Sequence, residues 1–395
     1  WLHLGTIGPK RVDMSEDGLS AKPPYKLVDN PDTWLEFADL VFIDPVTTGY
    51  SRAATGEDDS QFHGVSEDVR SVAEFIRLYT TRSKRWLSPK FLAGESYGTT
   101  RAAGLAGELQ SHHGMYLNGI VLISAILNFE TAEFDRGNDL PYALHLPTYA
   151  ATAWFHHRLA PELQRDLRAT LDEVEAFARG EYTLALMQGD RLPAADRAKI
   201  RTKLARYSGL SEAYVASTNE RIEISRFTKE LLRTQRRTVG RLDSRFLGRD
   251  YDAAGEGYEA DASYSAIQGP FTAVLNDYLR GELTYESDLP YEILTGRVHP
   301  WKYSQANNRY LNVADTLRQA MNQNPHLEVF VASGYFDLAT PYFATEYTLD
   351  HLGLEPELAG HVHRSFFESG HMMYIHKPSR EKLTRDVKAF VAATD

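Results

Sequence analysis

A serine bracketed by two glycines is the clearest candidate for chemistry in this sequence. The stretch is Gly94-Glu95-Ser96-Tyr97-Gly98. A serine becomes a nucleophile when a neighbouring base accepts its proton and a carboxylate orients that base. The pattern therefore predicts acyl transfer through Ser96, provided that the chain also supplies a histidine and an acid at the right places. The alternative is a serine in an ordinary turn between a strand and a helix.

The segments on either side of Ser96 are those that would hold a nucleophile at a sharp turn. Residues 90–93 predict a short buried strand, and residues 99–110, rich in alanine and leucine, predict a helix. A strand-to-helix turn with this spacing is typical of the nucleophile elbow of α/β-hydrolases. The tight turn favours glycine on both sides of the serine, and it directs the backbone N–H of Tyr97 toward a developing oxyanion.

Asp337 and His371 are the candidates for the acid and the base. Residues 327–332 predict a strand followed by the loop that holds Asp337, and residues 364–368 predict a last strand just before His371. Serine, then acid, then histidine is the order along the chain in α/β-hydrolase triads. Because each candidate follows a predicted strand, we expect all three at the same edge of a parallel sheet.

Other interpretations of these two residues stay open at the level of sequence. Asp337 could cap the helix that begins near Pro341, and His371 could be a surface histidine in a loop. His361 and His363 could join His371 in a metal site, but no His-Glu-x-x-His pattern accompanies them and no carboxylate stands at ligand spacing. We therefore predict neither a metal nor a cofactor.

Composition excludes several classes of function. The chain carries 43 basic and 54 acidic residues, a formal charge of −11, which disfavours binding to nucleic acid or to an anionic membrane surface. Cysteine is absent, which excludes disulfides, thiolate metal sites and cysteine catalysis but leaves the cellular compartment open. No apolar run is as long as a membrane span.

Alternating strands and helices predict the fold class. Residues 40–44 form an apolar run that predicts a buried parallel strand, and residues 64–81 predict an amphipathic helix. A further strand is expected at residues 119–124, after the helix that follows Ser96. This succession indicates a parallel sheet with helices packed on it.

The alternation stops in the middle of the chain. Residues 131–307 contain several stretches of helical character, among them 211–240, and then strands and helices alternate again. We therefore expect a core built from residues 1–130 and 308–395, with a largely helical cap inserted at 131–307.

Four motifs, in this order along the chain, resemble the serine carboxypeptidase family, peptidase family S10. They are residues 42–51, residues 94–98, residues 333–337 and residues 369–372. The resemblance covers roughly residues 1–150 and 308–395. It implies an α/β-hydrolase fold with a mostly parallel central sheet, flanking helices and a helical cap. It also implies removal of the C-terminal residue from peptides with a free C-terminus, usually at acid pH.

The resemblance implies a role for each candidate residue. Ser96 would be the nucleophile, His371 the general base and acid, and Asp337 the residue that orients the histidine. The backbone N–H of Tyr97 would be one donor of the oxyanion hole. Glu95 matches the glutamate of the family that helps to hold the terminal carboxylate of the substrate.

The resemblance implies that Glu95 is the residue responsible for a preference for acid pH. Two carboxyl groups attract each other only when one of them is protonated, so a glutamate that binds a carboxylate works best at low pH. The alternative is a charge at the end of a strand that pairs with a nearby arginine such as Arg101. On the same fold, an esterase, an acyltransferase, a hydroxynitrile lyase and a catalytically silent binding protein remain the rival functions.

One motif of the family is not found. Its members carry an Asn-Gly-Gly-Pro-Gly loop just before the position of Trp1, which supplies the second oxyanion donor, and the sequence has no such loop. We therefore expect the gene product to extend upstream, where the first strands of the core would lie. Losing one oxyanion donor costs on the order of a hundredfold in rate. The absence of cysteine suggests a bacterial-type relative, and the resemblance implies a periplasmic or secreted protein.

Overall fold

Four parallel strands form the central sheet of the computed structural model, which describes residues 1–394 apart from the side chain of Gln305. In their order across the sheet they are β3 (Phe91–Glu95), β4 (Gly119–Ile123), β7 (Glu328–Gly334) and β8 (Val362–Phe367). The last residue of β3 lies opposite the last residue of β4, and the same holds for β7 and β8. The residues that follow the strands are therefore gathered along one edge of the sheet.

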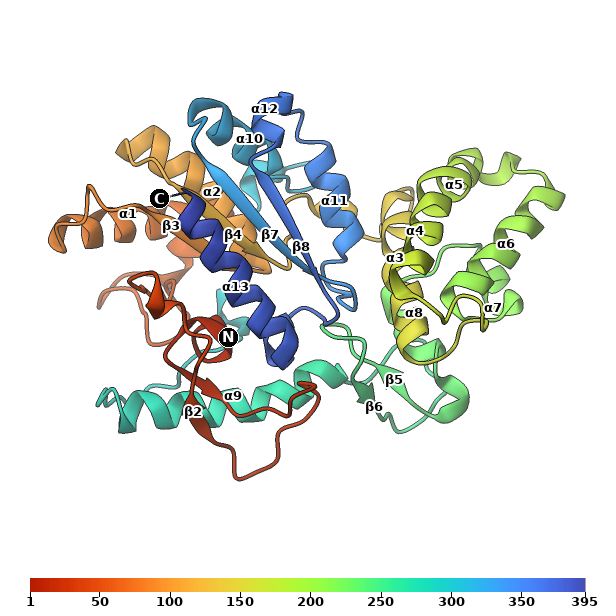
Figure 1. Ribbon diagram of the computed structural model, residues 1–395, viewed down its shortest axis with the longest axis horizontal. Helices are drawn as coiled ribbons and strands as arrows, with labels where there is room; N and C mark the ends of the chain where they lie inside the picture. Colours follow the sequence, from red (N-terminus) through yellow and green to blue (C-terminus); the bar gives the residue numbers. More distant parts are fainter. Residues whose placement is uncertain (395) are drawn as a thin grey trace.

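Helices cover both faces of this sheet (Figure 1). On one face, Leu122 and Val331 pack with helices α1, α2 and α10. On the other face, Val121 and Phe330 pack with α13 and α9. Strands buried on both faces consist of nearly continuous apolar residues, which is why the sequence predicted them. The helices are α1 (Val65–Arg82), α2 (Tyr97–His113), α9 (Ala262–Gly281), α10 (Ala314–Gln323) and α13 (Lys377–Thr394).

Most of the segment between β4 and β7 forms a helical lobe beside the sheet (Figure 1, yellow and green). The lobe packs on the core through α11 (Tyr342–Asp350), whose Tyr342 and Phe343 share one apolar cluster with the lobe helices. Helix α9 does not belong to the lobe, because its Phe271 and Val274 pack on the sheet side with Leu4. The lobe helices are α3 (Leu140–Phe155), α4 (Leu167–Phe177), α5 (Thr183–Gln188), α6 (Ala194–Ser208), α7 (Glu212–Ser217) and α8 (Ile224–Glu230).

The long helix suggested for residues 211–240 is wrong. This stretch contains the short helices α7 and α8, a 3-10 turn (Arg233–Gln235) and strand β5 (Thr238–Val239), and Asn219 and Glu220 between the two helices adopt positive φ angles of 53° and 60°. Left-handed residues interrupt an α-helix. The fold also contains two short antiparallel strand pairs and one short helix: β1 (Lys10–Val12) with β2 (Leu27–Asp29), β5 with β6 (Leu247–Gly248), and α12 (Pro356–Ala359).

The strand predicted at residues 40–44 is also wrong. Val41 and Phe42 are 44% and 42% exposed, and the segment pairs with no strand in residues 1–394. It lines one side of a cavity of about 540 Å³, and the outer edge of β3 lines another. An apolar run becomes a strand only where a neighbouring strand completes its hydrogen bonds. Phe42 instead stacks on His3, with 3.9 Å between the ring centres.

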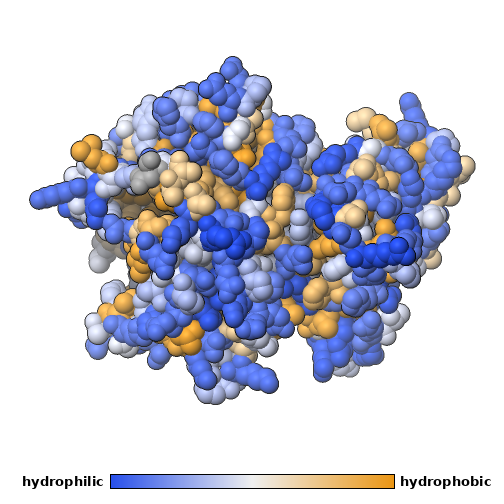
Figure 2. Space-filling model, viewed as in Figure 1, coloured by the Kyte–Doolittle hydropathy of each residue, from blue (hydrophilic) through white to orange (hydrophobic). Residues whose placement is uncertain are grey.

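The surface is mainly polar. Figure 2 shows hydrophilic side chains over most of the visible face, with apolar side chains in small groups. None of the helices in residues 1–394 is long and apolar enough to cross a membrane.

Candidate active site

Ser96 lies in a strained turn between β3 and α2. Its backbone angles, φ 57° and ψ −125°, belong to a region that residues other than glycine rarely adopt. The turn is held from both sides, because the Ser96 N–H donates to the Ile123 carbonyl at 3.0 Å and the Ser96 carbonyl accepts from Thr99 N at 2.9 Å. Within the part of the chain that the structure describes, the Ser96 hydroxyl makes no hydrogen bond. This conformation is the one that lifts a nucleophile clear of a sheet.

Gly94 and Gly98 differ in whether their surroundings have room for a side chain. A Cβ on Gly94 would lie 2.2 Å from the Gly98 carbonyl oxygen, a backbone atom that has no room to move. A Cβ on Gly98 would meet no heavy atom within 4 Å outside the adjacent residues and the backbone of its own helix turn, because Gly98 faces the 540 Å³ cavity. The expectation that the turn excludes side chains on both sides of Ser96 is therefore wrong for Gly98.

Alanine at these two glycines should give opposite results. We expect Gly94→Ala to lower the free energy of unfolding by about 1–3 kcal/mol, the usual range for an overpacked site. Gly98→Ala should leave stability unchanged or raise it by up to about 1 kcal/mol, because alanine favours a helix more than glycine does. Urea denaturation of both variants checks this, and equal losses would contradict the clash at Gly94.

Asp337 and His371 meet in a buried hydrogen bond. The distance from His371 Nδ1 to Asp337 Oδ2 is 2.7 Å, and the two residues are 5% and 0% exposed. Asp337 Oδ1 accepts from the backbone N–H groups of Ala339 and Thr340, at 2.8 and 3.0 Å. The Thr340 hydroxyl donates to Asp337 Oδ2 at 2.7 Å. These bonds leave the carboxylate a single orientation, with one oxygen directed at the imidazole.

The surroundings of His371 favour its protonated form. Burial lowers the pKa of His371, but the charge of Asp337, its hydrogen bond and the charge of Glu95 outweigh burial, so the net pKa lies above the usual value. The His371 carbonyl accepts from the Ser124 hydroxyl at 2.7 Å. Ser124 directly follows β4, so the end of the neighbouring strand holds the backbone of the histidine.

Backbone hydrogen bonds join the ends of adjacent strands at this edge. The Ser124 N–H donates to the Ala332 carbonyl at 2.9 Å, and Tyr335 N donates to the Phe367 carbonyl at 2.9 Å. Together with the bond from Ser96 to Ile123, these contacts connect the ends of all four strands. The structure thus brings Ser96, Asp337 and His371 to one edge of the sheet.

Glu95 is hydrogen-bonded to Tyr374 and not to Arg101. The Tyr374 hydroxyl donates to both carboxylate oxygens of Glu95 at 2.9 Å. Arg101 instead pairs with Asp68 at 2.7 Å, so the pairing of Glu95 with Arg101 is wrong. Burial raises the pKa of Glu95 above its usual value, although nearby His371 acts in the opposite direction. Glu95 lines the same 540 Å³ cavity as Gly98, which is part of the elbow.

Tyr97 is the first residue of α2. The first four N–H groups of a helix have no partner within the helix, and the helix dipole adds partial positive charge there. The Tyr97 amide directly follows the serine, so it can donate to an oxygen at the reacting carbon.

The three histidines considered for a metal site do not converge. His361 and His363 lie at the start of β8 and face Glu328, with nitrogen-to-oxygen distances of 3.7 and 2.8 Å. His371 follows the other end of the same strand. No cluster of three or more metal-binding side chains occurs among the described residues.

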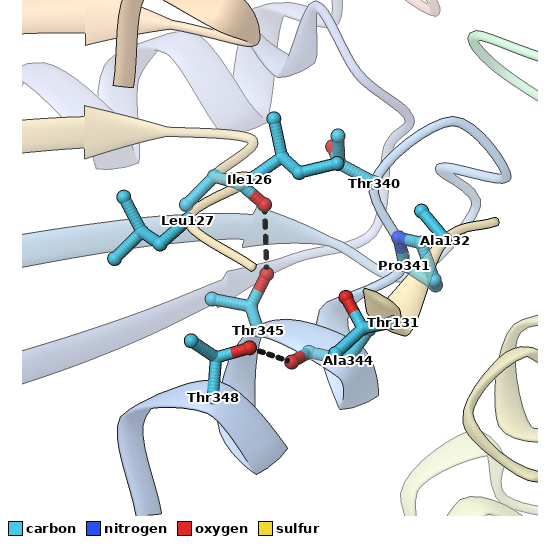
Figure 3. Close-up of a pocket in the computed structure, with 10 residues that line it drawn as sticks. Ile126, Leu127, Thr131, Ala132, Thr340, Pro341, Ala344, Thr345 and Thr348 are labelled. Carbon is cyan, nitrogen blue, oxygen red and sulfur yellow. Dashed lines mark hydrogen bonds between the residues drawn. The ribbon is translucent and has the colours of Figure 1, made fainter. Parts of the chain in front are cut away.

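Three residues of the site were missed by sequence reasoning: Ser124, Thr340 and Tyr374. Thr340 stands three residues after Asp337, a spacing typical of side-chain bonds in turns, so this signal was available. Figure 3 shows Thr340 beside a small cavity of about 10 Å³ between α11 and the loop after β4. There Thr345 donates to the Ala125 carbonyl at 3.2 Å, which ties α11 to that loop. No local pattern points to Tyr374.

A comparison with models of protein families identifies one family. The family model for serine carboxypeptidase matches residues 6–368. No curated protein sequence matches the chain.

A solved structure shows the same fold. The chain is similar to Kex1(delta)p, a prohormone-processing carboxypeptidase from Saccharomyces cerevisiae, with 14% identity, a TM-score of 0.54 and coverage of 99% of this chain and 80% of that one. A weaker likeness is to VinJ, with 12% identity, a TM-score of 0.35 and coverage of 89% and 79%. The sheet and its flanking helices are those of an α/β-hydrolase. Since the family model spans nearly the whole sequence, this chain belongs to the serine carboxypeptidase family.

Proposed function

We propose that this protein removes the C-terminal residue of peptides that have a free C-terminus, through an acyl-enzyme on Ser96. His371 acts as general base and then as general acid, and Asp337 orients it. The observation that carries this proposal is the buried 2.7 Å hydrogen bond between His371 and Asp337, at the sheet edge where Ser96 occupies a nucleophile elbow. Membership of the serine carboxypeptidase family supports it.

The reaction follows from these positions. The Ser96 oxygen attacks the carbonyl carbon of the last peptide bond, and its proton passes to the ring nitrogen of His371 that does not face Asp337. The carboxylate of Asp337 stabilises the imidazolium, and the Tyr97 N–H donates to the oxyanion. His371 then protonates the departing amino group, and the C–N bond breaks. Water, deprotonated by His371, hydrolyses the ester and restores the serine.

Glu95 is proposed to bind the terminal carboxylate of the substrate. Its burial and raised pKa favour a protonated carboxyl group, which can donate to a carboxylate. Glu95 lines the cavity that reaches Gly98, but Ser96, Asp337 and His371 do not line it, so the proposal rests on the position of Glu95 next to Ser96 and on its burial.

The decisive test is mass spectrometry over time on a mixture of N-blocked peptides, near pH 5 and pH 7.5. We expect stepwise loss of C-terminal residues by the protein and none by Ser96→Ala. A fluorophosphonate should label the protein at Ser96 and leave Ser96→Ala unlabelled. Intact peptides together with labelled Ser96 would favour an esterase or acyltransferase, and no labelling at all would refute the catalytic role of Ser96.

Glu95→Gln should move the pH dependence of activity in a defined direction. In its ionised form Glu95 raises the pKa of His371, so glutamine at this position lowers that pKa in the pH range where Glu95 carries its charge. The histidine then stays neutral, and able to accept a proton, at lower pH. On an ester substrate without a free carboxylate, the acid limb of kcat/KM should therefore shift to lower pH.

Glu95→Gln also tests the proposed role of Glu95 in substrate binding separately from its effect on the pKa of His371. The glutamine amide donates at every pH, so for peptides with a free C-terminus KM should no longer rise as pH increases. A rise in KM equal to that of the unmodified protein would show that Glu95 does not bind the carboxylate. Glu108→Gln on α2 serves as a control, because it also removes a partly buried carboxylate charge but lies away from the triad.

Family membership also supports a place of action outside the cytoplasm, either periplasmic or secreted. Cell fractionation followed by the peptide assay tests this, and activity confined to the cytoplasmic fraction would refute it.

A further inference from the structure

The loop of the β5–β6 hairpin reaches back to the two catalytic loops. We call residues 241–245 the bridge segment; they connect β5 to β6 and lie between the lobe and α9. The Leu242 carbonyl accepts from the His371 N–H at 2.7 Å, and the Arg241 carbonyl accepts from Leu338 N at 3.1 Å. The Ser244 N–H donates to the Phe336 carbonyl at 2.9 Å. The bridge segment is therefore bonded to the backbone on both sides of Asp337 and at His371 itself.

Two charged residues of the bridge segment are buried against the histidine loop. Asp243 and Arg245 are 2% and 5% exposed and pair at 2.7 Å. Asp243 Oδ2 accepts from the Gly370 N–H at 3.1 Å, and Arg245 donates to the Ser369 hydroxyl at 2.9 Å. Every residue from Ser369 to His371 thus has a partner in the bridge segment.

The fit between these segments leaves no space. A Cβ on Gly370 would lie 2.4 Å from Asp243 Cβ, and a Cβ on Gly334 would lie 2.3 Å from the Gly370 carbonyl oxygen. The end of β7, the histidine loop and the bridge segment are therefore in direct backbone contact. A shift of Asp243 must move Gly370, and with it the residue that carries the imidazole.

The bridge segment is itself fixed from outside the catalytic loops. The Ser244 hydroxyl shares a 2.6 Å hydrogen bond with Thr152, and the Ser244 carbonyl lies 2.7 Å from His156 Nε2, both on or just after α3 of the lobe. On the other side, the Leu242 N–H donates to the Ser263 hydroxyl of α9 at 3.0 Å. The bridge segment therefore connects the lobe and α9 to the acid and the base.

We propose that Asp243 and Arg245 are positioning residues, which fix the backbone of the histidine loop so that His371 is aligned with Asp337 and with the serine. This inference rests on the proposed role of His371. The pair touches neither the imidazole nor the serine, and it acts through Ser369 and Gly370. An error of about 1 Å in the position of a catalytic group can cost about a hundredfold in rate, so loss of the pair should appear in kcat.

The test compares two broken ion pairs. Asp243→Asn removes the charge that faces Arg245 and weakens the contact to Gly370. Asp250→Asn is the matched control: the side chains of Asp250 and its partner Lys229 are 4% and 3% exposed, against 3% and 4% for those of Asp243 and Arg245, but Asp250 contacts neither catalytic loop. Each kcat is divided by the amount of Ser96 that reacts with a fluorophosphonate, so that unfolded protein is not counted.

Two readouts are measured, kinetics and proton NMR of the low-field proton between His371 Nδ1 and Asp337 Oδ2. For Asp243→Asn we expect kcat to fall about 10- to 100-fold with KM unchanged, and the proton resonance to shift or broaden. Asp250→Asn should leave both kcat and the proton resonance unchanged. The inference is overturned if kcat per reactive serine and the resonance of Asp243→Asn match those of Asp250→Asn.

If Asp243→Asn does not fold, a milder variant tests whether the bridge segment positions His371. Ser369→Ala removes only the hydroxyl that Arg245 holds, and it should lower kcat about 3- to 10-fold and shift the resonance. An unchanged kcat and resonance in Ser369→Ala would overturn the inference. The NMR signal also separates this inference from the proposed function: if no peptide is cleaved but the resonance responds as expected, the bridge segment positions His371 and the proposed substrate is wrong.

Discussion

Replacing Ser96 by alanine is expected to lower kcat by about a millionfold while the protein stays folded. The hydroxyl makes no hydrogen bond in the described part of the chain, so its loss removes no stabilising contact. Alanine keeps the strained backbone at φ 57° and ψ −125°, so thermal stability should not change. Replacement by glycine should be equally inactive but more stable, by about 1 kcal/mol, because glycine adopts these angles without strain.

The comparison of alanine with glycine at Ser96 measures the strain stored at the nucleophile. Ser111 is a suitable control, because it lies in the regular part of α2 and is exposed. There glycine should be less stable than alanine by about 1 kcal/mol, the ordinary cost of glycine in a helix. If Ser96→Gly is less stable than Ser96→Ala, the elbow is not strained in the protein.

Replacing Asp337 by asparagine should lower kcat by about 10³- to 10⁴-fold. The amide oxygen can still accept from Ala339 and Thr340, which hold Asp337 Oδ1 at 2.8 and 3.0 Å, so the loop should keep its shape. The amide nitrogen, however, would face His371 Nδ1 and favour the tautomer whose other nitrogen carries a proton. That nitrogen cannot then accept the proton of Ser96. KM should change little, since Asp337 is fully buried.

The loss of the Asp337 charge has a second, independent signature. Asp337 is the main group that raises the pKa of His371 against the effect of burial, so that pKa should fall in Asp337→Asn. The acid limb of the remaining kcat/KM should move to lower pH. Asp250→Asn again serves as the control for the loss of a buried carboxylate. An activity within tenfold of the unmodified protein would rule out Asp337 as the residue that orients the base.

The parts of the site that were predictable are those with a local signal. A buried parallel strand is a continuous apolar run, and the loop after it lies at the functional edge of the sheet, so Ser96, Asp337 and His371 could be placed on that edge. Their roles stay predictions until the variants are measured. Gly94 was interpreted correctly because the turn itself requires it, whereas Gly98 was not, because its environment depends on a distant cavity.

The predictions that were wrong or missing concern contacts between segments that are far apart in the chain. Residues 40–44 have the composition of a strand, but composition does not state whether a neighbouring strand is present. The contact of Asp243 with Gly370 joins residues more than a hundred positions apart, and nothing near Asp243 in the sequence indicates it. Tyr374 as the partner of Glu95 is a case of the same kind.

The order of the strands along the chain has a consequence for how the protein folds. Strands β3 and β4 with helix α2 form one local unit, and β7 and β8 with α11 form another, and about 200 residues separate them. Local contacts form quickly, while joining distant segments requires the closure of a long loop. The serine therefore belongs to one early unit and the acid and histidine to the other. During refolding, helical structure should return before activity, which must wait until β4 pairs with β7.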